Sequence, residues 1–233
     1  MTGIVSGRSN IYNASARAKA RKASLIDPTR MRQLLQLGPE SIGASIGELG
    51  YRSEMDIYSA RMDGADAVML SGETSVGNYP VEVIETMTRI IESVEDSPLI
   101  KVPISQPQVK NQRFITKSIC YHAASMADSI NAKAITTLTN SGYTAFQISA
   151  WRPKSHILVF TSNHRILTQL NLLWGVRAYF YDKLVSTDDT IDDINTICKE
   201  KKYVKKGDMV VNLAAMPIVA KGMVNTMRVS EIE

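Results

Sequence analysis

From residue 115 onward, segments with helix-like and strand-like spacing of apolar residues alternate along the chain. The helix-like segments repeat apolar residues every three or four positions, and the strand-like segments are short apolar runs. Helices are predicted over 115–130, 144–151, 166–173 and 191–201, and strands over 132–138, 156–160, 176–181, 209–213 and 227–232. This alternation implies right-handed crossovers, so the predicted fold class is α/β with a mostly parallel sheet.

An earlier segment, 51–97, has the pattern of one strand followed by one helix. Ala67–Leu70 is an apolar run without alternation, as in a strand buried on both faces, and a short helix is predicted before it. The polar loop Ser71–Thr74 follows the run. Pro80 fits the first position of a helix over 81–94, whose apolar residues are spaced by three and four. Polar residues at the carboxyl end of such a strand are where α/β folds place their chemistry.

Prolines mark the boundary between these two parts. Residues 97–113 include Pro98, Pro103 and Pro107 among serines and glutamines, which predicts an extended linker. The predicted organisation is a poorly ordered basic head at 1–50, a β/α unit at 51–97, a linker at 98–113 and a larger domain at 114–233.

The basic charge is concentrated in the head. Residues 1–33 carry seven Lys or Arg and one Asp, a balance of +6, whereas the remainder carries 20 basic and 22 acidic residues, a balance of −2. A mildly acidic body does not predict a nucleic-acid-binding domain, and no apolar run approaches the ~20 residues of a membrane span. Cys120 and Cys198 have no metal-ligand or redox spacing, which favours buried free thiols in a reducing compartment.

Two stretches resemble a known family. Residues 63–74 read Asp-Gly-Ala-Asp-Ala-Val-Met-Leu-Ser-Gly-Glu-Thr, and residues 77–80 read Gly-Asn-Tyr-Pro. They closely resemble the last barrel strand and helix of pyruvate kinase, and residues 117–232 resemble that family's carboxyl-terminal domain. The resemblance implies a remnant of a TIM-barrel β/α unit, followed by a five-stranded sheet with helices on both faces and an antiparallel last strand.

The head at 1–50 does not share this resemblance, and three interpretations are open. Its acid-poor composition with Arg and Ser allows an organelle presequence, although no clear amphipathic face accompanies it. A disordered basic arm is the second interpretation. The third is a reading-frame change or gene truncation upstream, because the resemblance is lost abruptly. Reading the upstream DNA in all three frames would test it.

The loop Ser71–Thr74 is the candidate catalytic site. The resemblance implies that Ser71 and Glu73 lie near the active site and help to relay a proton to the enolpyruvate carbon, since a carboxylate can orient a hydroxyl or a water. From residue types alone, a helix-capping loop is the competing interpretation. In that case Ser or Thr satisfies free amides and Glu favours the positive end of the helix.

A second polar loop lies between a predicted strand and a predicted helix, and it is the candidate effector site. Its residues are Thr139, Asn140, Ser141, Gly142, Tyr143 and Thr144. Hydroxyls, a glycine and helix-start amides suit either a phosphate cradle or an ordinary helix cap. The resemblance favours phosphate, because the effector loop of pyruvate kinase reads Thr-x-Ser-Gly-x-Ser/Thr, which matches positions 139, 141, 142 and 144.

The region expected to hold a second phosphate departs from the family pattern. Family members regulated by a sugar bisphosphate have a Trp-Arg-Pro-Gly-rich loop and an earlier Trp and Arg. Here residues 214–222 are mostly apolar, and the region around Thr190 offers Asp188, Asp189 and Asp192. A second phosphate is expected to meet carboxylates and apolar side chains, so tight binding of a bisphosphate is not predicted, and a monophosphate effector stays open.

The resemblance implies phosphoryl transfer from phosphoenolpyruvate to ADP, with Mg²⁺ and K⁺ as cofactors, in a cytoplasmic homo-oligomer that is a tetramer in the family. In the family, the transfer lysine and the ligands for metal, potassium and nucleotide lie on earlier barrel strands. Those motifs have no counterpart here, so the chain is expected to be inactive alone. The alternative is a non-catalytic module that binds a phosphorylated small-molecule effector or mediates oligomerisation. Neither nucleic acid nor a membrane is an expected partner.

Overall fold

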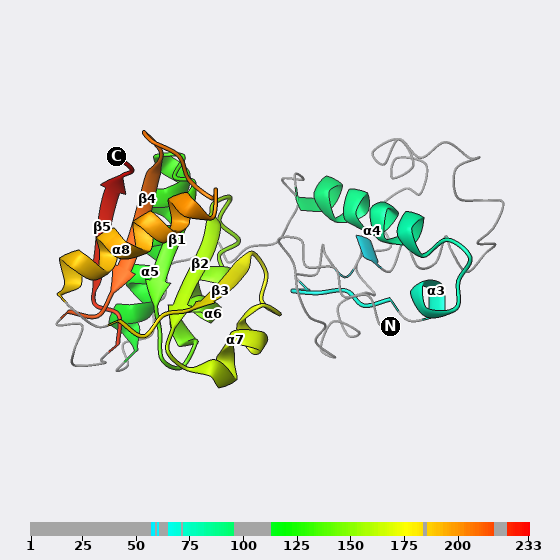
Figure 1. The fold of residues 1–233 in the computed structure, drawn as a ribbon, viewed down its shortest axis with the longest axis horizontal. Coiled ribbons are helices and arrows are strands. Elements are labelled where there is room, and N and C mark those ends of the chain that lie inside the picture. Colours follow the sequence, from blue (N-terminus) through cyan, green and yellow to red (C-terminus); the bar gives the residue numbers. More distant parts are fainter. Residues whose placement is uncertain are drawn as a thin grey trace. The chain divides into compact units, whose positions relative to one another are not determined.

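The computed structural model describes residues 57, 58, 60, 65–70, 72–95, 113–183, 186–216 and 223–233. The chain divides into two compact units, Met1–Lys101 and Val102–Glu233, which are called the N-terminal and C-terminal units below (Figure 1). The head predicted at 1–50 and almost all of the linker predicted at 98–113 lie outside the described residues. Both therefore stay predictions.

The N-terminal unit packs around helix α4 (Pro80–Glu95). The helix begins at Pro80, as predicted, because the fixed φ of proline suits the first helical position and no N–H is needed there. Its buried residues are Met87, Ile90, Ile91 and Val94. Met87 and Ile91 cluster with Val68 and Leu70, so the apolar run before the helix supplies the other side of this core.

The run Ala67–Leu70 differs from the predicted strand. Ala67, Val68 and Leu70 are buried, but Met69 is 72% exposed. Isolated β-bridges at Asp66 and Met69 take the place of a continuous strand. A strand in a sheet needs neighbours that accept and donate its backbone hydrogen bonds, and the strands of the described residues all belong to the sheet of the C-terminal unit. The apolar pattern thus predicts burial, while strand pairing depends on a partner.

The predicted polar loop contains a single helical turn, α3 (Gly72–Ser75). The backbone N–H groups of Val76 and Gly77 both donate to the Gly72 carbonyl oxygen at 3.0 Å and close this turn. Position 77 has no room for a side chain, because a Cβ there would lie 2.2 Å from the Glu73 carbonyl oxygen. Gly77 is therefore required for the close approach of α3 to the residues that follow it.

The C-terminal unit is built on a five-stranded sheet in the order β3-β2-β1-β4-β5. The strands are β1 (Ala134–Leu138), β2 (His156–Thr161), β3 (Val176–Phe180), β4 (Met209–Ala214) and β5 (Thr226–Glu231). β1 pairs in parallel with β2 and β4, β2 pairs in parallel with β3, and β5 runs antiparallel to β4. The prediction of a mostly parallel sheet with an antiparallel last strand is confirmed.

Helices cover both faces of this sheet (Figure 1). The helices are α5 (Phe114–Ser129), α6 (Tyr143–Ser149), α7 (His164–Leu170) and α8 (Thr187–Glu200). Residues of α5, α6 and α7 pack in the core on one face, and residues of α8 pack in the core on the other. Successive residues of β1 serve the two cores in turn: Ile135 belongs to the first and Ala134 to the second.

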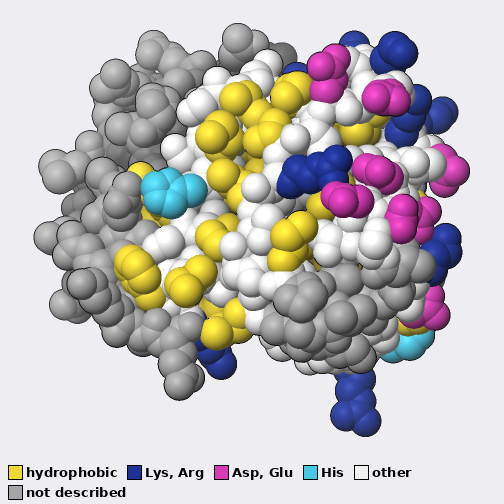
Figure 2. Space-filling model, turned by 90° about the vertical axis from the view of Figure 1, so that its left-hand side faces the viewer, with side chains coloured by type: hydrophobic (Ala, Val, Ile, Leu, Met, Phe, Trp, Pro, Cys, Tyr) yellow, Lys and Arg dark blue, Asp and Glu magenta, His cyan; other side chains and the backbone are white. Residues whose placement is uncertain are grey.

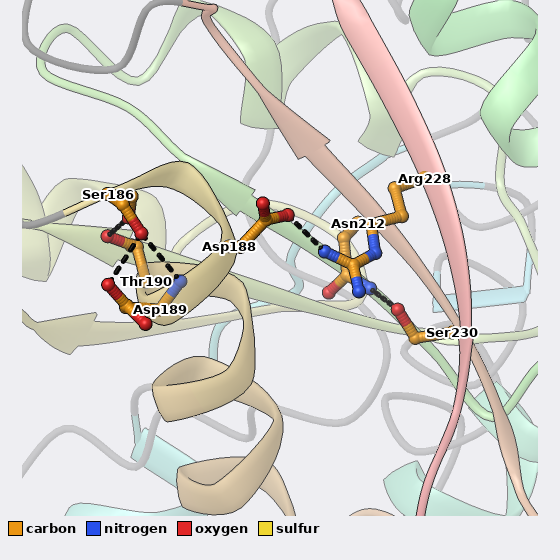
Figure 3. Close-up of polar contacts among 7 residues, drawn as sticks. All are labelled: Ser186, Asp188, Asp189, Thr190, Asn212, Arg228 and Ser230. Carbon is orange, nitrogen blue, oxygen red and sulfur yellow. Dashed lines mark hydrogen bonds and ion pairs between the residues drawn. The ribbon is translucent and has the colours of Figure 1, made fainter.

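Helix α8 begins at Thr187, earlier than the predicted start at 191. Ser186 caps it: the hydroxyl oxygen accepts a hydrogen bond from the Asp189 N–H at 3.1 Å, and the hydroxyl donates to the Asp189 carboxylate at 2.6 Å (Figure 3). The first turn carries two aspartates, which the positive end of the helix favours. Apolar spacing misses this turn because its residues are polar.

Both cysteines are buried free thiols, as predicted. Cys120 lies in α5 and Cys198 in α8, so they belong to the cores on opposite faces of the sheet. Burial raises the pKa of each thiol to about 12. Both thiols therefore stay protonated and poorly nucleophilic near neutral pH.

Two pairs of oppositely charged side chains lie on the surface of the C-terminal unit. Arg228 contacts Asp188 at 2.6 Å, and Lys183 contacts Asp193 at 3.1 Å. Acidic and basic side chains lie intermixed on the face drawn in Figure 2. A nucleic-acid backbone is bound by clustered basic side chains, and this face does not have that pattern. None of the helices within the described ranges has the length and apolar character that a membrane crossing requires.

Candidate functional site

A cavity of about 390 Å³ opens at the carboxyl edge of the parallel strands in the C-terminal unit. Its lining residues are Thr116, Leu138, Thr139, Asn140, Ser141, Tyr143, Thr144, Phe160, Thr161, Ser162, Tyr181, Ala215, Met223 and Val224. They come from α5, from the ends of β1 and β2, from the loop into α6, and from segments that follow β3 and flank the β4–β5 connection. This edge is where open α/β sheets bind ligands.

The loop 139–144 holds its shape through Gly142. This residue precedes α6 with a left-handed φ of 79°, and a Cβ there would lie 3.0 Å from the Leu170 side chain. Its N–H donates to the Thr139 hydroxyl oxygen at 3.0 Å, and the Asn163 side chain donates to the Asn140 carbonyl oxygen at 3.1 Å. Gly142 does not itself line the cavity. It fixes the turn that brings the other loop residues to the cavity wall.

Thr144 provides the most buried side chain of this loop. The residue is 5% exposed and lines the cavity. Its backbone carbonyl oxygen accepts from the Cys120 thiol of α5 at 4.0 Å. A hydroxyl in a cavity wall can donate a hydrogen bond to a bound ligand or accept one from it. Ser141 lies at the exposed rim.

Two further lining residues are aromatic, Phe160 and Tyr181, and sequence reasoning missed them. Phe160 and Tyr181 are 1% and 6% exposed, and their rings meet edge to face with centroids 6.1 Å apart. The Tyr181 hydroxyl donates to the Asp193 carboxylate at 3.0 Å. Burial and this carboxylate raise the pKa of Tyr181 to about 12, so the phenol is neutral at physiological pH. The sequence did contain one signal for this part of the cavity. Thr161 and Ser162 directly follow a predicted strand, as Thr139 and Asn140 do, and the ends of parallel strands meet at one edge of a sheet.

The carboxylates expected near a second phosphate do not reach the cavity. Asp188 binds the Arg228 guanidinium on β5, and Asp189 binds the Ser186 hydroxyl (Figure 3). The described lining residues include neither these aspartates nor Asp192. The expected repulsion by carboxylates is therefore corrected: the described lining has no charged side chain of either sign. The described wall contains no Lys or Arg side chain that could bind a second phosphate.

The candidate catalytic pair is in the other unit. Ser71 lies outside the described residues, and Glu73 is half-buried in α3. The proton-relay role of the pair stays a prediction. No group of three or more His, Cys, Asp or Glu side chains that could hold a metal ion occurs within the described parts of either unit.

Comparison with known proteins gives one consistent family. A family model described as "Pyruvate kinase, alpha/beta domain" matches residues 117–230. The pyruvate kinase of Clostridium acetobutylicum is 33% identical over 178 residues, which cover 76% of this chain and 38% of that protein. The pyruvate kinase of Geobacillus stearothermophilus is 34% identical over 208 residues, which cover 89% of this chain and 34% of that protein.

A crystal structure of a pyruvate kinase from Cryptosporidium parvum is similar in fold. It matches with a TM-score of 0.63 and 25% identity, over 78% of this chain and 36% of that one. The chain thus spans little more than a third of the length of the relatives that it matches. Residues 117–230, with their five-stranded sheet, are a pyruvate kinase alpha/beta domain, and through this domain the chain belongs to the pyruvate kinase family.

Proposed function

We propose that the C-terminal unit binds a phosphorylated small-molecule effector in the cavity beside residues 139–144. The observation that carries this proposal is the place of Thr144, a residue 5% exposed, in the wall of a cavity of about 390 Å³ that Thr139, Asn140, Ser141 and Tyr143 also line. The loop also matches the effector-phosphate loop of the pyruvate kinase family at four positions. Hydroxyls of Ser141 and Thr144 would donate to phosphate oxygens, together with backbone N–H groups at the start of α6.

The effector of this site carries one phosphate. Phosphate is held most strongly by Arg or Lys in addition to neutral donors. The described cavity wall offers hydroxyls and amides but no basic side chain, so a second phosphate would lose water without gaining a charged partner. Monophosphate binding is therefore weak to moderate, and bisphosphate binding is not much tighter.

Isothermal titration calorimetry with inorganic phosphate and with fructose 1,6-bisphosphate tests this proposal. We expect Ser141→Ala with Thr144→Val to weaken phosphate binding at least about tenfold, because each hydrogen bond to a charged group contributes about 1.5–3 kcal/mol and 1.4 kcal/mol is a factor of ten. Thr196→Val is the matched control, since its hydroxyl donates to the Asp192 carbonyl oxygen on exposed α8. An equal loss of phosphate affinity in the Ser141→Ala, Thr144→Val chain and in the Thr196→Val control would contradict the proposed site. Bisphosphate binding more than about a hundredfold tighter than phosphate (~2.7 kcal/mol) would contradict the single-phosphate proposal.

For the family reaction, we propose that a complete protein of this type transfers the phosphoryl group from phosphoenolpyruvate to ADP, as a cytoplasmic homotetramer with Mg²⁺ and K⁺. Its similarity to pyruvate kinases supports this. Ser71 and Glu73 would move the proton to the enolpyruvate carbon, with the carboxylate orienting the hydroxyl or a water. The metal would supply charge neutralisation of the transferred phosphoryl group. The 233 residues alone do not turn over, since the metal and transfer-lysine motifs have no counterpart in them.

A coupled assay of pyruvate formation with lactate dehydrogenase, in saturating Mg²⁺ and K⁺, tests this second proposal. We expect a rate equal to that of the assay mixture without the chain. A rate that rises with chain concentration and falls in Glu73→Gln would contradict inactivity, and it would support a catalytic role for this carboxylate. Activity unchanged in Glu73→Gln would argue against that role.

A further inference from the structure

One face of helix α5 meets the loop 139–144. Thr116 of this helix lines the cavity, and the Cys120 thiol contacts the Thr144 carbonyl oxygen at 4.0 Å. Arg113 directly precedes α5, and its carbonyl oxygen accepts the first of the helical hydrogen bonds, from the Lys117 N–H at 3.0 Å. Positions three and four apart share a face of a helix, so Arg113 lies on the same face as Thr116 and Cys120.

A contact with Tyr143 places the charge of Arg113 beside the cavity. The guanidinium carbon of Arg113 lies 4.6 Å from the centroid of the Tyr143 ring. Tyr143 lines the cavity, and its neighbours in the chain are Gly142, which shapes the loop, and Thr144, which is part of the wall. Arg113 is exposed and is not among the lining residues. It therefore brings a positive charge to within one aromatic ring of a wall whose described side chains are all uncharged.

An arginine placed over a ring is suited to binding phosphate. The guanidinium contacts the ring through its face, while its N–H donors point outward in its plane and match the geometry of phosphate oxygens. The ring also restricts the side chain, so less freedom is lost when a ligand binds. A phosphomonoester carries a charge of about −1.5 to −2 at neutral pH. A guanidinium next to the loop therefore adds an attraction that the hydroxyls and amides of the loop lack.

We propose that Arg113 is the cation of the phosphate site. Held against the Tyr143 ring, its guanidinium attracts the effector phosphate to residues 139–144 and binds it from the side of α5. This inference rests on the proposed function, since it takes the phosphate to lie at this loop. It adds a charged binding residue from outside the cavity wall. A single guanidinium serves a single phosphate, so the effector still carries one phosphate.

Isothermal titration calorimetry of the full chain with inorganic phosphate tests the inference. We expect Arg113→Gln to weaken phosphate binding at least about fivefold, because a charge-assisted hydrogen bond is lost. Arg113→Lys should recover part of this loss, since lysine keeps the charge but not the fork of donors. Lys201→Gln is the matched control and should bind phosphate as the wild-type chain does. The Lys201 ammonium nitrogen lies 4.7 Å from the centroid of the Tyr179 ring, and Tyr179 is not among the described lining residues.

Salt dependence is a second readout, and a purely structural role of Arg113 would not change it. Attraction between exposed charges is screened by salt, with a Debye length of about 10 Å at 0.1 M ionic strength and about 3 Å at 1 M. Raising NaCl from about 0.05 M to about 0.5 M should weaken phosphate binding at least about threefold in the wild-type and Lys201→Gln chains, and less than about 1.5-fold in Arg113→Gln. A wild-type affinity that does not depend on salt would overturn the inference.

The outcomes separate this inference from the proposed function, with tryptophan fluorescence to verify that each variant is folded. If phosphate binding needs Ser141 and Thr144 but is unchanged in Arg113→Gln, the phosphate site stands and the role of Arg113 is overturned. If Arg113→Gln and Lys201→Gln lose the same affinity, the effect is that of net charge, and the assignment to Arg113 is overturned. If the wild-type chain does not bind phosphate, the proposed function and this inference fail together.

Discussion

Replacing Ile135 with alanine is expected to lower the free energy of unfolding of the C-terminal unit by about 2–5 kcal/mol. Ile135 is 0% exposed in the central strand β1, directly beside Ile157 of β2 and Val211 of β4 in the sheet register. All three residues belong to the core beneath α5 and α6. The shorter side chain loses its burial and leaves a cavity between elements that cannot close around it.

Ile115→Ala is the matched control, because the same atoms are removed from a residue that is 62% exposed on α5. We expect this change to alter stability by less than about 0.5 kcal/mol. Urea unfolding followed by tryptophan fluorescence measures both variants, since Trp151 and Trp174 are the two tryptophans of the chain and lie in the C-terminal unit. Similar losses in the two variants would contradict the packing of β1 at the centre of the core.

Replacing Asn212 with leucine is expected to cost about 1–3 kcal/mol, although leucine is the more apolar residue. Asn212 is 2% exposed, and its side-chain oxygen accepts from the Thr136 hydroxyl at 2.6 Å. Its side-chain nitrogen donates to the Ser230 hydroxyl oxygen at 3.0 Å (Figure 3). The change leaves the Thr136 hydroxyl, in a residue also 2% exposed, without a partner in the core.

The double variant Thr136→Val, Asn212→Leu separates the hydrogen bond from the packing. We expect it to recover most of the loss, because two apolar side chains replace both members of a buried polar pair. Ser230 is only half-buried, so water can satisfy its hydroxyl. Urea unfolding of the single and double variants gives the coupling energy. A double variant as unstable as the sum of the two single variants would show that the pair contributes nothing as a pair.

The candidate site was predictable in part. The loop 139–144 could be found because hydroxyls and glycine follow an apolar strand, and the cavity does lie beside that loop. The expected contribution of Asp188 and Asp189 could not be judged from the sequence. Their side chains turn to Arg228 and Ser186, and both of these contacts depend on how α8 begins and where β5 lies.

Local sequence patterns are sufficient to predict the order of helices and strands in the C-terminal unit, the sheet type and the start of α4 at Pro80. These depend on local properties, since the period of apolar residues and the backbone of proline act within a few positions. Only the tertiary structure brought Phe160, Tyr181 and Met223 to one cavity from three separate segments. Likewise, Ala67–Leu70 could be predicted as buried but not as paired. Convergence and pairing depend on residues far away in the sequence, and a local pattern carries no information about them.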